Sequence, residues 1–128
     1  MSSLKRNRLK GALIGAGMVS AYHLHAWRKI NQAQIVAIAD TNLERAQARA
    51  HQFGIEKNRA YSNFSELLQG EKELDFVDIT APPDAHLELI RLAAERRLHI
   101  TCQKPFAESL SEARQMMQIC QKANLILN

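Results

Sequence analysis

The feature that most constrains this chain is a regular alternation of short apolar runs with amphipathic helical periods. Strand-like runs cover residues 9–14, 34–39, 59–62, 76–80, 99–102 and 125–127, and a helical period separates each run from the next. A helix between two strands returns the chain across the sheet, so consecutive strands run parallel. Nearly continuous apolar strands agree, because a parallel sheet is covered on both faces. The pattern predicts a three-layer α/β/α domain with a doubly wound parallel sheet.

Capping residues and apolar spacing predict where the helices begin and which sides they bury. The predicted starts are residue 18 and the capping residues Thr41 (with Glu44), Asn63 (with Glu66), Asp84 and Ser109 (with Glu112). The residues predicted to face the sheet are Val19, Tyr22, Ala26, Trp27 and Ile30 in the first helix; Leu43, Ala46, Ala50 and Phe53 in the second, which ends at Gly54; Leu87, Ile90 and Ala94 in the fourth; and Ala113, Met116, Met117 and Cys120 in the fifth.

Length and composition fit one globular domain. The chain has 128 residues, of which 46% are hydrophobic and 23% charged. Its apolar runs are too short to cross a bilayer, and no apolar signal core follows the basic N-terminus, so the expected location is the cytoplasm. Cys102 and Cys120 lie outside any metal-binding spacing and are predicted to be buried or half-buried thiols.

The net charge of +4 does not by itself indicate nucleic-acid binding. The basic residues are scattered and have no aromatic residues between them on which bases could stack, and a modest positive excess also suits a polyanionic cofactor. His23 and His25 are expected to be solvated or half-buried helix residues. No histidines and carboxylates have metal-ligand spacing, and no Ser/His/Asp set stands out, so the sequence predicts neither a metal site nor a nucleophile.

A glycine turn follows the first predicted strand: Gly15-Ala16-Gly17-Met18-Val19-Ser20. Gly15 permits a tight turn, Gly17 lets the backbone approach a pyrophosphate, and the third position needs a small residue where helix meets strand. Ser20 is small, although Gly or Ala is more usual there. The free N–H groups at the helix start and the positive end of its dipole then face the phosphates. With a strand before it and a helix after it, the turn indicates a Rossmann-type dinucleotide site.

Asp40 lies at the end of the second predicted strand, about twenty residues after the turn, where a carboxylate accepts hydrogen bonds from the adenosine ribose hydroxyls. The alternative is an ordinary helix-capping acid, but Thr41 is already expected to cap this helix. Because a carboxylate repels a 2′-phosphate, Asp40 predicts NAD rather than NADP. Arg45, one helical turn further on, could offset part of this repulsion between the carboxylate and a 2′-phosphate.

Four features give the chain a family resemblance: the Gly15–Ser20 turn, Asp40, the segment Thr80-Ala81-Pro82-Pro83-Asp84-Ala85-His86, and Gln103-Lys104-Pro105. Together they span nearly the whole chain, which resembles the glucose–fructose oxidoreductase, inositol dehydrogenase and rhizopine-catabolism (Gfo/Idh/MocA) family. The resemblance implies that this domain binds the dinucleotide. It also implies that a second α/β domain with an open sheet binds a sugar, polyol or related substrate.

The resemblance also implies roles for residues in the two later loops. Lys104 would lie next to the nicotinamide and the reacting hydroxyl, where its ammonium stabilises developing negative charge. Gln103 stands where the family more usually has glutamate, so it can bond a ribose hydroxyl but supplies no charge. His86 is expected either near the cofactor or on the surface at a helix start. The predicted cofactor-binding residues are Gly15, Gly17, Met18, Val19, Ser20, Asp40, Thr41, Thr80, Ala81, Pro82, Pro83, His86, Gln103 and Lys104.

Three functional hypotheses follow. The first takes residues 1–128 as the NAD(P)-binding domain of an oxidoreductase that acts on a CH–OH group by hydride transfer. On this interpretation the chain lacks the substrate domain and binds the cofactor without turnover. The second is a non-catalytic dinucleotide-binding or regulatory module. The third, a binder of S-adenosylmethionine, is disfavoured by Lys104 with its following proline and by the Pro82–Pro83 loop. The sequence leaves homo-oligomerisation open.

Overall fold

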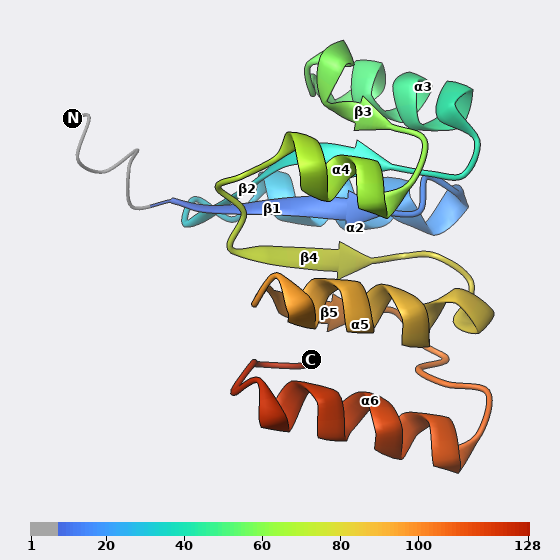
Figure 1. Cartoon of the computed structure of the whole chain (residues 1–128). Coiled ribbons are helices and arrows are strands. Elements are labelled where there is room, and N and C mark those ends of the chain that lie inside the picture. Colours follow the sequence, from blue (N-terminus) through green and yellow to red (C-terminus); the bar gives the residue numbers. More distant parts are fainter. Residues whose placement is uncertain (1–7) are drawn as a thin grey trace.

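The computed structural model describes residues 8–128 and contains one five-stranded sheet in the order β3-β2-β1-β4-β5 (Figure 1). Every pair of neighbouring strands is parallel. The chain begins in the middle of the sheet, moves to one edge, and then crosses to β4 and the other edge. This topology confirms the predicted doubly wound Rossmann arrangement. The strands are β1 (Leu9–Ile14), β2 (Ala33–Ala39), β3 (Ala60–Tyr61), β4 (Phe76–Ile79) and β5 (His99–Cys102).

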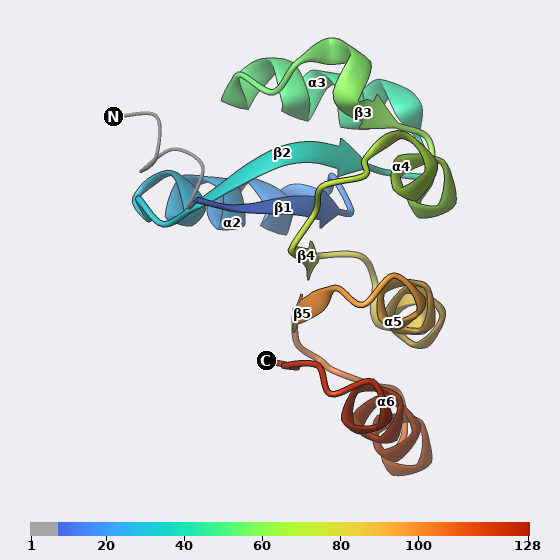
Figure 2. The same ribbon diagram turned by 60° about the vertical axis from the view of Figure 1, so that its left-hand side comes forward.

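Helices cover both faces of the sheet and divide the core in two. On one face α2 (Met18–Arg28) and α3 (Leu43–Phe53) pack through Leu24 and Ala50 against Leu13 and Ile38. On the other face lie α4 (Phe64–Gly70), α5 (His86–Glu95) and α6 (Leu110–Lys122), which bury side chains against Val77 and Ile100. Figure 2 shows α4, α5 and α6 together on one side of the sheet. The predicted three layers are therefore present.

The buried side of α2 differs from the prediction. Tyr22 is 70% exposed, and Val19 and Ile30 are exposed as well, whereas Ser20 and Leu24 are the buried residues of the helix. The small Ser20 side chain allows the first turn of the helix to lie close against the sheet. Burial therefore follows Ser20 and Leu24. The side chains of Val19, Tyr22, Ala26 and Ile30, which were predicted as core, face solvent, whereas Trp27 is half-buried and packs against the core as predicted.

Two helix starts also differ from the prediction. The cap of α3 is Asn42, whose side chain accepts a hydrogen bond from the Arg45 N–H, so the capping box predicted at Thr41 is wrong. Asp84 lies in a short 3-10 turn, Pro83–Ala85, and α5 itself begins at His86. Asn42 thus replaces Thr41 as the cap of α3, whereas α5 has no side-chain cap, because the 3-10 turn that begins at Pro83 leads directly into it.

The remaining caps were predicted correctly. Asn63 and Ser109 each accept a hydrogen bond from the N–H three residues later, and Gly54 ends α3 with a left-handed φ of 73°. Leu43 and Met117, predicted as core, are instead exposed. The predicted sixth strand is reduced to one parallel bridge between Ile100 and Leu127. Within the described part of the chain, no helix has the length and apolar character needed to cross a membrane.

Candidate functional site

A groove lies at the carboxyl ends of the parallel strands, between the loops that follow β1, β2, β4 and β5. It consists of a hollow of about 350 Å³ beside a second hollow of about 300 Å³, which share Gly15, Asp40, Arg45, Ala81 and Pro82. In open α/β sheets, ligands bind at this edge, where the strand order reverses. The structure brings most of the predicted cofactor-binding residues to the first hollow: Gly15, Gly17, Met18, Val19, Asp40, Thr80, Ala81, Pro82, Pro83, Gln103 and Lys104.

Gly15 forms the tight turn between β1 and α2. Its φ is 109°, a conformation that residues with a side chain rarely adopt. A Cβ atom at this position would lie 2.6 Å from the backbone nitrogen of Ala81. The hydroxyl of Thr80 donates to the carbonyl of Gly15 at 2.6 Å, and its N–H donates to Ile14. The turn and the loop after β4 are thus packed directly against each other.

Gly17 precedes the first residue of α2 and faces open space. A Cβ built at this position meets no atom within 4 Å. No side chain caps the helix, and its first turn contains no acidic residue. The first N–H groups of a helix have no intrahelical partner and carry a partial positive charge. This end of α2 can therefore accept an anionic group at the backbone.

Asp40 connects the end of β2 to the glycine turn. One carboxylate oxygen accepts a hydrogen bond from the Ala16 N–H at 2.8 Å, and the other accepts from the Asn42 N–H at 2.8 Å. The second oxygen also accepts from the exposed guanidinium of Arg45 at 3.3 Å. The carboxylate is thus held rigidly at the groove, and its charge is partly balanced by Arg45.

Arg49 is a site-supporting residue that the sequence analysis missed. It reaches from α3 and donates hydrogen bonds to the carbonyl of Gly17 at 2.9 Å and to that of Ala16. Its guanidinium holds the turn from behind and adds positive charge near the start of α2. Sequence spacing gives no signal for this contact, because 32 residues separate the two groups.

Lys104 and Gln103 lie after β5 at the same groove. Lys104 is exposed, and no carboxylate of residues 8–128 lies within ion-pair range of its ammonium. The Gln103 N–H donates to the Ile79 carbonyl at 2.9 Å, which fixes the start of this loop beside β4. A free ammonium at this position can donate to an oxygen atom of a bound molecule.

A buried acid, Asp78, lies beneath this loop and was also missed. Its side chain is fully buried in β4, and one oxygen accepts hydrogen bonds from the Trp27 indole and lies 2.7 Å from Nδ1 of His23. Nε2 of His23 in turn lies 3.3 Å from Oε1 of Gln103. His23 is half-buried, as predicted, but it connects a buried carboxylate to the Lys104 loop.

Three predicted site residues do not line the first hollow. Thr41 lines only the neighbouring hollow. Ser20 is fully buried behind the turn, where its hydroxyl donates to the Gly17 carbonyl. His86 is fully buried, which excludes the alternative that it lies on the surface. Both buried side chains reach the groove only through the backbone groups that they bond.

The two thiols do not provide a nucleophile. Burial, the charge of Asp78 and the proximity of Cys120 raise the pKa of Cys102 to about 12, and burial also raises the pKa of Cys120. Cys102 is half-buried and Cys120 is buried, which confirms the prediction for both. The thiol of Cys102 therefore stays protonated at neutral pH.

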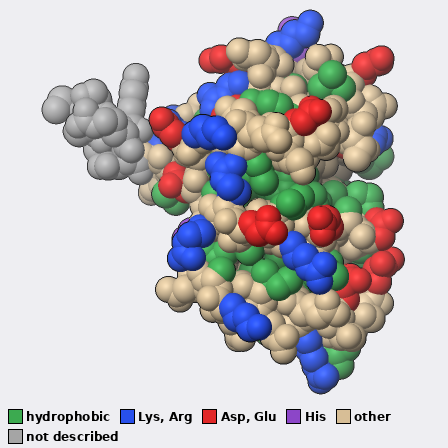
Figure 3. All heavy atoms as spheres, in the orientation of Figure 1, with side chains coloured by type: hydrophobic (Ala, Val, Ile, Leu, Met, Phe, Trp, Pro, Cys, Tyr) green, Lys and Arg blue, Asp and Glu red, His purple; other side chains and the backbone are tan. Residues whose placement is uncertain are grey.

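The second hollow is the more apolar part of the groove. Phe64, Leu89 and Leu92 line it from α4 and α5. Figure 3 shows hydrophobic side chains at the surface between these two helices, with basic and acidic side chains scattered over the rest of the face. A flat apolar ring fits this part of the groove, while the first hollow also contains the polar side chains of Thr80, Gln103 and Lys104.

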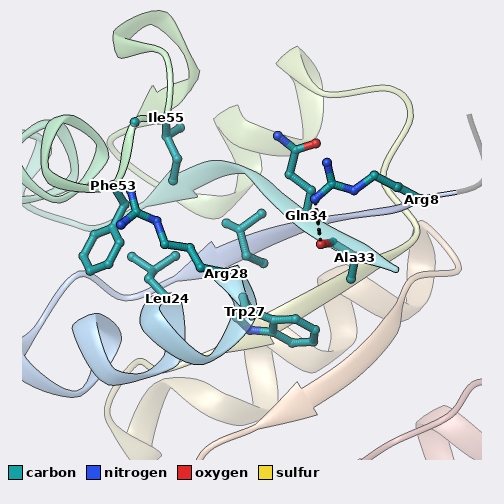
Figure 4. A pocket seen from close by; sticks show the side chains of 10 residues that line it. Arg8, Leu24, Trp27, Arg28, Ala33, Gln34, Phe53 and Ile55 are labelled. Carbon is teal, nitrogen blue, oxygen red and sulfur yellow. Dashed lines mark hydrogen bonds between the residues drawn. The ribbon is translucent and has the colours of Figure 1, made fainter. Parts of the chain in front are cut away.

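A separate cavity of about 210 Å³ lies at the opposite edge of the sheet, where β2 begins (Figure 4). Trp27, Phe53 and Ile55 line it, together with Arg8 and Arg28. Arg28 stacks over the Phe53 ring at 5.0 Å, and Arg8 donates to the Ala33 carbonyl. None of the loops at the carboxyl ends of the strands reaches this cavity, so it is not part of the groove.

The groove combines an uncapped helix start, open space at Gly17, a fixed carboxylate after β2 and an apolar hollow beside it. These features fit the pyrophosphate, ribose and adenine of a dinucleotide, and they define a dinucleotide-binding Rossmann domain. The model of the oxidoreductase family with an NAD-binding Rossmann fold, Gfo/Idh/MocA, matches residues 9–128. The chain belongs to this family.

Individual relatives agree with the family. The chain is 47% identical over 120 residues to a D-apiose dehydrogenase of Paraburkholderia graminis, covering 94% of this chain and 31% of the relative. It is 29% identical over 115 residues to a myo-inositol 2-dehydrogenase of Thermotoga maritima, covering 90% of this chain and 34% of the relative. The chain thus spans about a third of the length of these relatives.

A solved structure shows the same fold. The crystal structure of an oxidoreductase from Agrobacterium radiobacter, in complex with NAD+, L-tartaric acid and magnesium, has a TM-score of 0.88 and 40% sequence identity to this chain. The match covers 94% of this chain and 34% of that structure.

Proposed function

We propose that this chain is the NAD-binding part of an oxidoreductase that oxidises a CH–OH group of a sugar, polyol or similar substrate. The observation that carries the proposal is the groove itself. The uncapped start of α2 at Gly17, the carboxylate of Asp40 and the ammonium of Lys104 all line one groove. These groups suit, in turn, the pyrophosphate, the adenosine ribose and the nicotinamide end of a dinucleotide. The named dehydrogenases among the relatives support the substrate class.

Each residue has a separate task in this proposal. Bound NAD supplies the acceptor for a hydride. The amides at Gly17 and the start of α2 hold the pyrophosphate, and Asp40 accepts hydrogen bonds from the adenosine ribose. Thr80 and the two following prolines support the cofactor from the loop after β4. Lys104 hydrogen-bonds the reacting substrate oxygen and stabilises the negative charge that develops there.

The same groove supports NAD over NADP. A 2′-phosphate on the adenosine ribose would meet the Asp40 carboxylate, whose oxygens are already fixed by Ala16 and Asn42. Arg45 lies against this carboxylate and offsets part of the repulsion. We therefore expect a preference for NADH with measurable NADPH binding.

The test is a fluorescence titration of the unmodified protein and the Asp40→Ala variant with NADH and NADPH. Asp40→Ala should weaken NADH binding by about tenfold, since hydrogen bonds to a charged group contribute about 1.5–3 kcal/mol, and should narrow the gap to NADPH. Tighter binding of NADPH than of NADH by the unmodified protein would refute the specificity. A rise in melting temperature with S-adenosylmethionine but not with NADH would refute the proposed NAD-binding function.

Catalysis in the whole protein belongs to the same proposal. A polyhydroxylated substrate would bind a second domain, and the chain described here would supply the cofactor and Lys104. A cytoplasmic location and the absence of nucleic-acid partners belong to the same proposal, which leaves homo-oligomerisation open. The second candidate is a non-catalytic dinucleotide-binding module, which is favoured by one observation, namely that Gln103 is neutral where the resemblance leads one to expect a glutamate.

A further inference from the structure

A series of side-chain contacts runs from the buried interior of the sheet to the loop after β5, which carries Lys104. Oδ2 of Asp78, in β4, lies 2.7 Å from Nδ1 of His23 and accepts a hydrogen bond from the Trp27 indole. On the other side of the imidazole ring, Nε2 of His23 lies 3.3 Å from Oε1 of Gln103. Lys104 is the next residue along the chain. Strand β4, helix α2 and the loop after β5 thus meet at one histidine.

Asp78 is a fixed support for this series. Its side chain is fully buried, and the Trp27 ring that donates to it packs on Phe76 with 4.9 Å between the ring centroids. A proton between Oδ2 of Asp78 and Nδ1 of His23 joins the two groups whichever of them carries it. The His23 side chain is only 21% exposed, so it has little space in which to rotate. The ring is therefore held in one orientation, with Nε2 directed at Gln103.

The contact with Gln103 does not depend on the protonation state of the ring. A side-chain amide has an acceptor oxygen and a donor nitrogen, and a half-turn of the amide exchanges their places. A protonated Nε2 donates to the amide oxygen, and a bare Nε2 accepts from the amide nitrogen. An ionised glutamate at residue 103 would bond only to a protonated Nε2, because a carboxylate has no donor. The neutral Gln103 thus suits its position beside His23.

Gln103 is the last residue before Lys104 that contacts the sheet. Its N–H donates to the Ile79 carbonyl at 2.9 Å, and the pairing of β4 with β5 ends one residue earlier. Pro105, two residues further on, has no N–H to donate. The contact with His23 adds a side-chain anchor to the backbone bond, so Gln103 is held at two points directly before Lys104.

We propose that His23 is a positioning residue, which holds the Gln103 side chain in place against Asp78 and thereby orients Lys104 toward the groove. His23 lines neither hollow of the groove, so it acts through Gln103. The proposal rests on the proposed function, because the orientation of Lys104 matters where its ammonium stabilises charge on a substrate oxygen.

The first test measures how rigidly Gln103 is held, by ¹⁵N relaxation of its side-chain amide. In the unmodified protein we expect an order parameter close to that of rigid backbone, about 0.85, without any ligand present. A value below about 0.6 would overturn the proposal, because the amide would then be mobile. This measurement needs neither a variant nor bound NADH.

The same measurement on His23→Asn and His25→Asn shows whether His23 provides the anchor. Asparagine at residue 23 keeps a donor near the position of Nδ1 but lacks the part of the ring that reaches Gln103. His25→Asn places the same substitution on an exposed residue of the same helix and is the matched control. The order parameter should fall in His23→Asn alone. An amide that stays rigid in His23→Asn would refute the role of His23.

The second test asks whether the anchor affects catalysis in the whole protein. His23→Asn should lower kcat by about tenfold, less than the loss of about 10²-fold that a 1 Å misplacement causes, and should leave the NADH dissociation constant unchanged. The double variant His23→Asn/Gln103→Ala should lose no more kcat than Gln103→Ala alone, because both changes break the same connection. Additive losses, or an equal loss in His25→Asn, would overturn the positioning role.

Failure of the proposed function would be recognised separately. If the unmodified protein did not bind NADH, or if Lys104→Ala left turnover unchanged, the proposed function would be refuted. The order parameters would still report whether His23 holds Gln103.

Discussion

Gly15 and Gly17 lie two residues apart in one turn, and they lack a side chain for opposite reasons. At Gly15 the backbone itself requires glycine, because φ is 109° and a Cβ would collide with the backbone of Ala81. At Gly17 the backbone is ordinary, with a φ of −77°, and the space around a Cβ is empty. The first glycine serves folding, and the second leaves room for a ligand.

This contrast predicts different outcomes for the same substitution. Gly15→Ala should destabilise the fold by about 1–3 kcal/mol, because a residue with a side chain is forced into a sparsely populated conformation. Gly17→Ala should leave the melting temperature unchanged and weaken NADH binding by about tenfold or more, the effect of losing one close phosphate contact. Thermal denaturation and NADH titration measure the two effects. If Gly17→Ala bound NADH as tightly as the unmodified protein, the pyrophosphate would not bind at Gly17.

A polar cluster at the opposite end of the sheet joins several elements. The buried carboxylate of Glu71, just after α4, accepts hydrogen bonds from Arg59 and from the hydroxyl of Tyr61 in β3. Arg96, which follows α5, donates to the carbonyls of Leu68 and Glu71. The cluster therefore ties α4 and α5 to the edge of the sheet.

The cluster shifts two pKa values in opposite directions. Burial raises the pKa of the Glu71 carboxyl, but the hydrogen bonds from Arg59 and Tyr61 outweigh burial and leave the pKa below its ordinary value of 4.5. Burial and the bond to Glu71 raise the pKa of Tyr61 to about 12. A lowered carboxyl pKa means that the charged form stabilises the fold above pH 4.5, and that this stabilisation is lost as the pH falls through the folded-state pKa.

Replacing Glu71 tests this element-level contact. Glu71→Gln should lower the free energy of unfolding by about 1–3 kcal/mol at pH 7, since Arg59 loses its charged partner. The difference from the unmodified protein should shrink as the pH falls below 4.5. Urea denaturation at several pH values measures it. A difference that does not vary with pH would show that the carboxylate charge is not what stabilises the cluster.

At the scale of the whole molecule, the groove exists because four loops end at one edge of a parallel sheet (Figure 1). The loops come from segments up to about ninety residues apart, and Lys104 lies at the end of the groove formed by the β1, β4 and β5 loops. In the proposed function, the pyrophosphate and the adenosine ribose are bound by other loops than the one that carries Lys104, which makes cofactor affinity and turnover separable by mutation.

In the whole protein, Lys104→Ala should lower turnover by about 10²–10³-fold, the range for loss of one donor that stabilises developing negative charge. NADH affinity should change little, because the pyrophosphate and ribose contacts lie on other loops. Steady-state kinetics and NADH titration on the same preparation measure both. Unchanged turnover would exclude Lys104 from the mechanism.

Much of the fold and part of the site were predictable because their signals are local. Strand runs, the Asn63 and Ser109 caps and the left-handed stop at Gly54 depend on residues within a few positions of each other. Asp40 and the glycine turn were found by spacing within one strand–helix–strand unit. The buried side of α2 and the cap of α3 were missed, because close packing at Ser20 and a better-placed Asn42 overrode the local patterns.

The sequence by itself therefore determined the order of elements, the parallel sheet and the loops that carry the predicted site residues, since periodicity and turn chemistry act over short distances. Only the tertiary structure decided how those loops are supported. Arg49 behind the turn, Asp78 beneath His23 and His86 between two carbonyls all join residues that are far apart in the chain. Such contacts depend on which side chains the folded sheet brings together. The spacing of residues along the sequence does not show which distant side chains become neighbours.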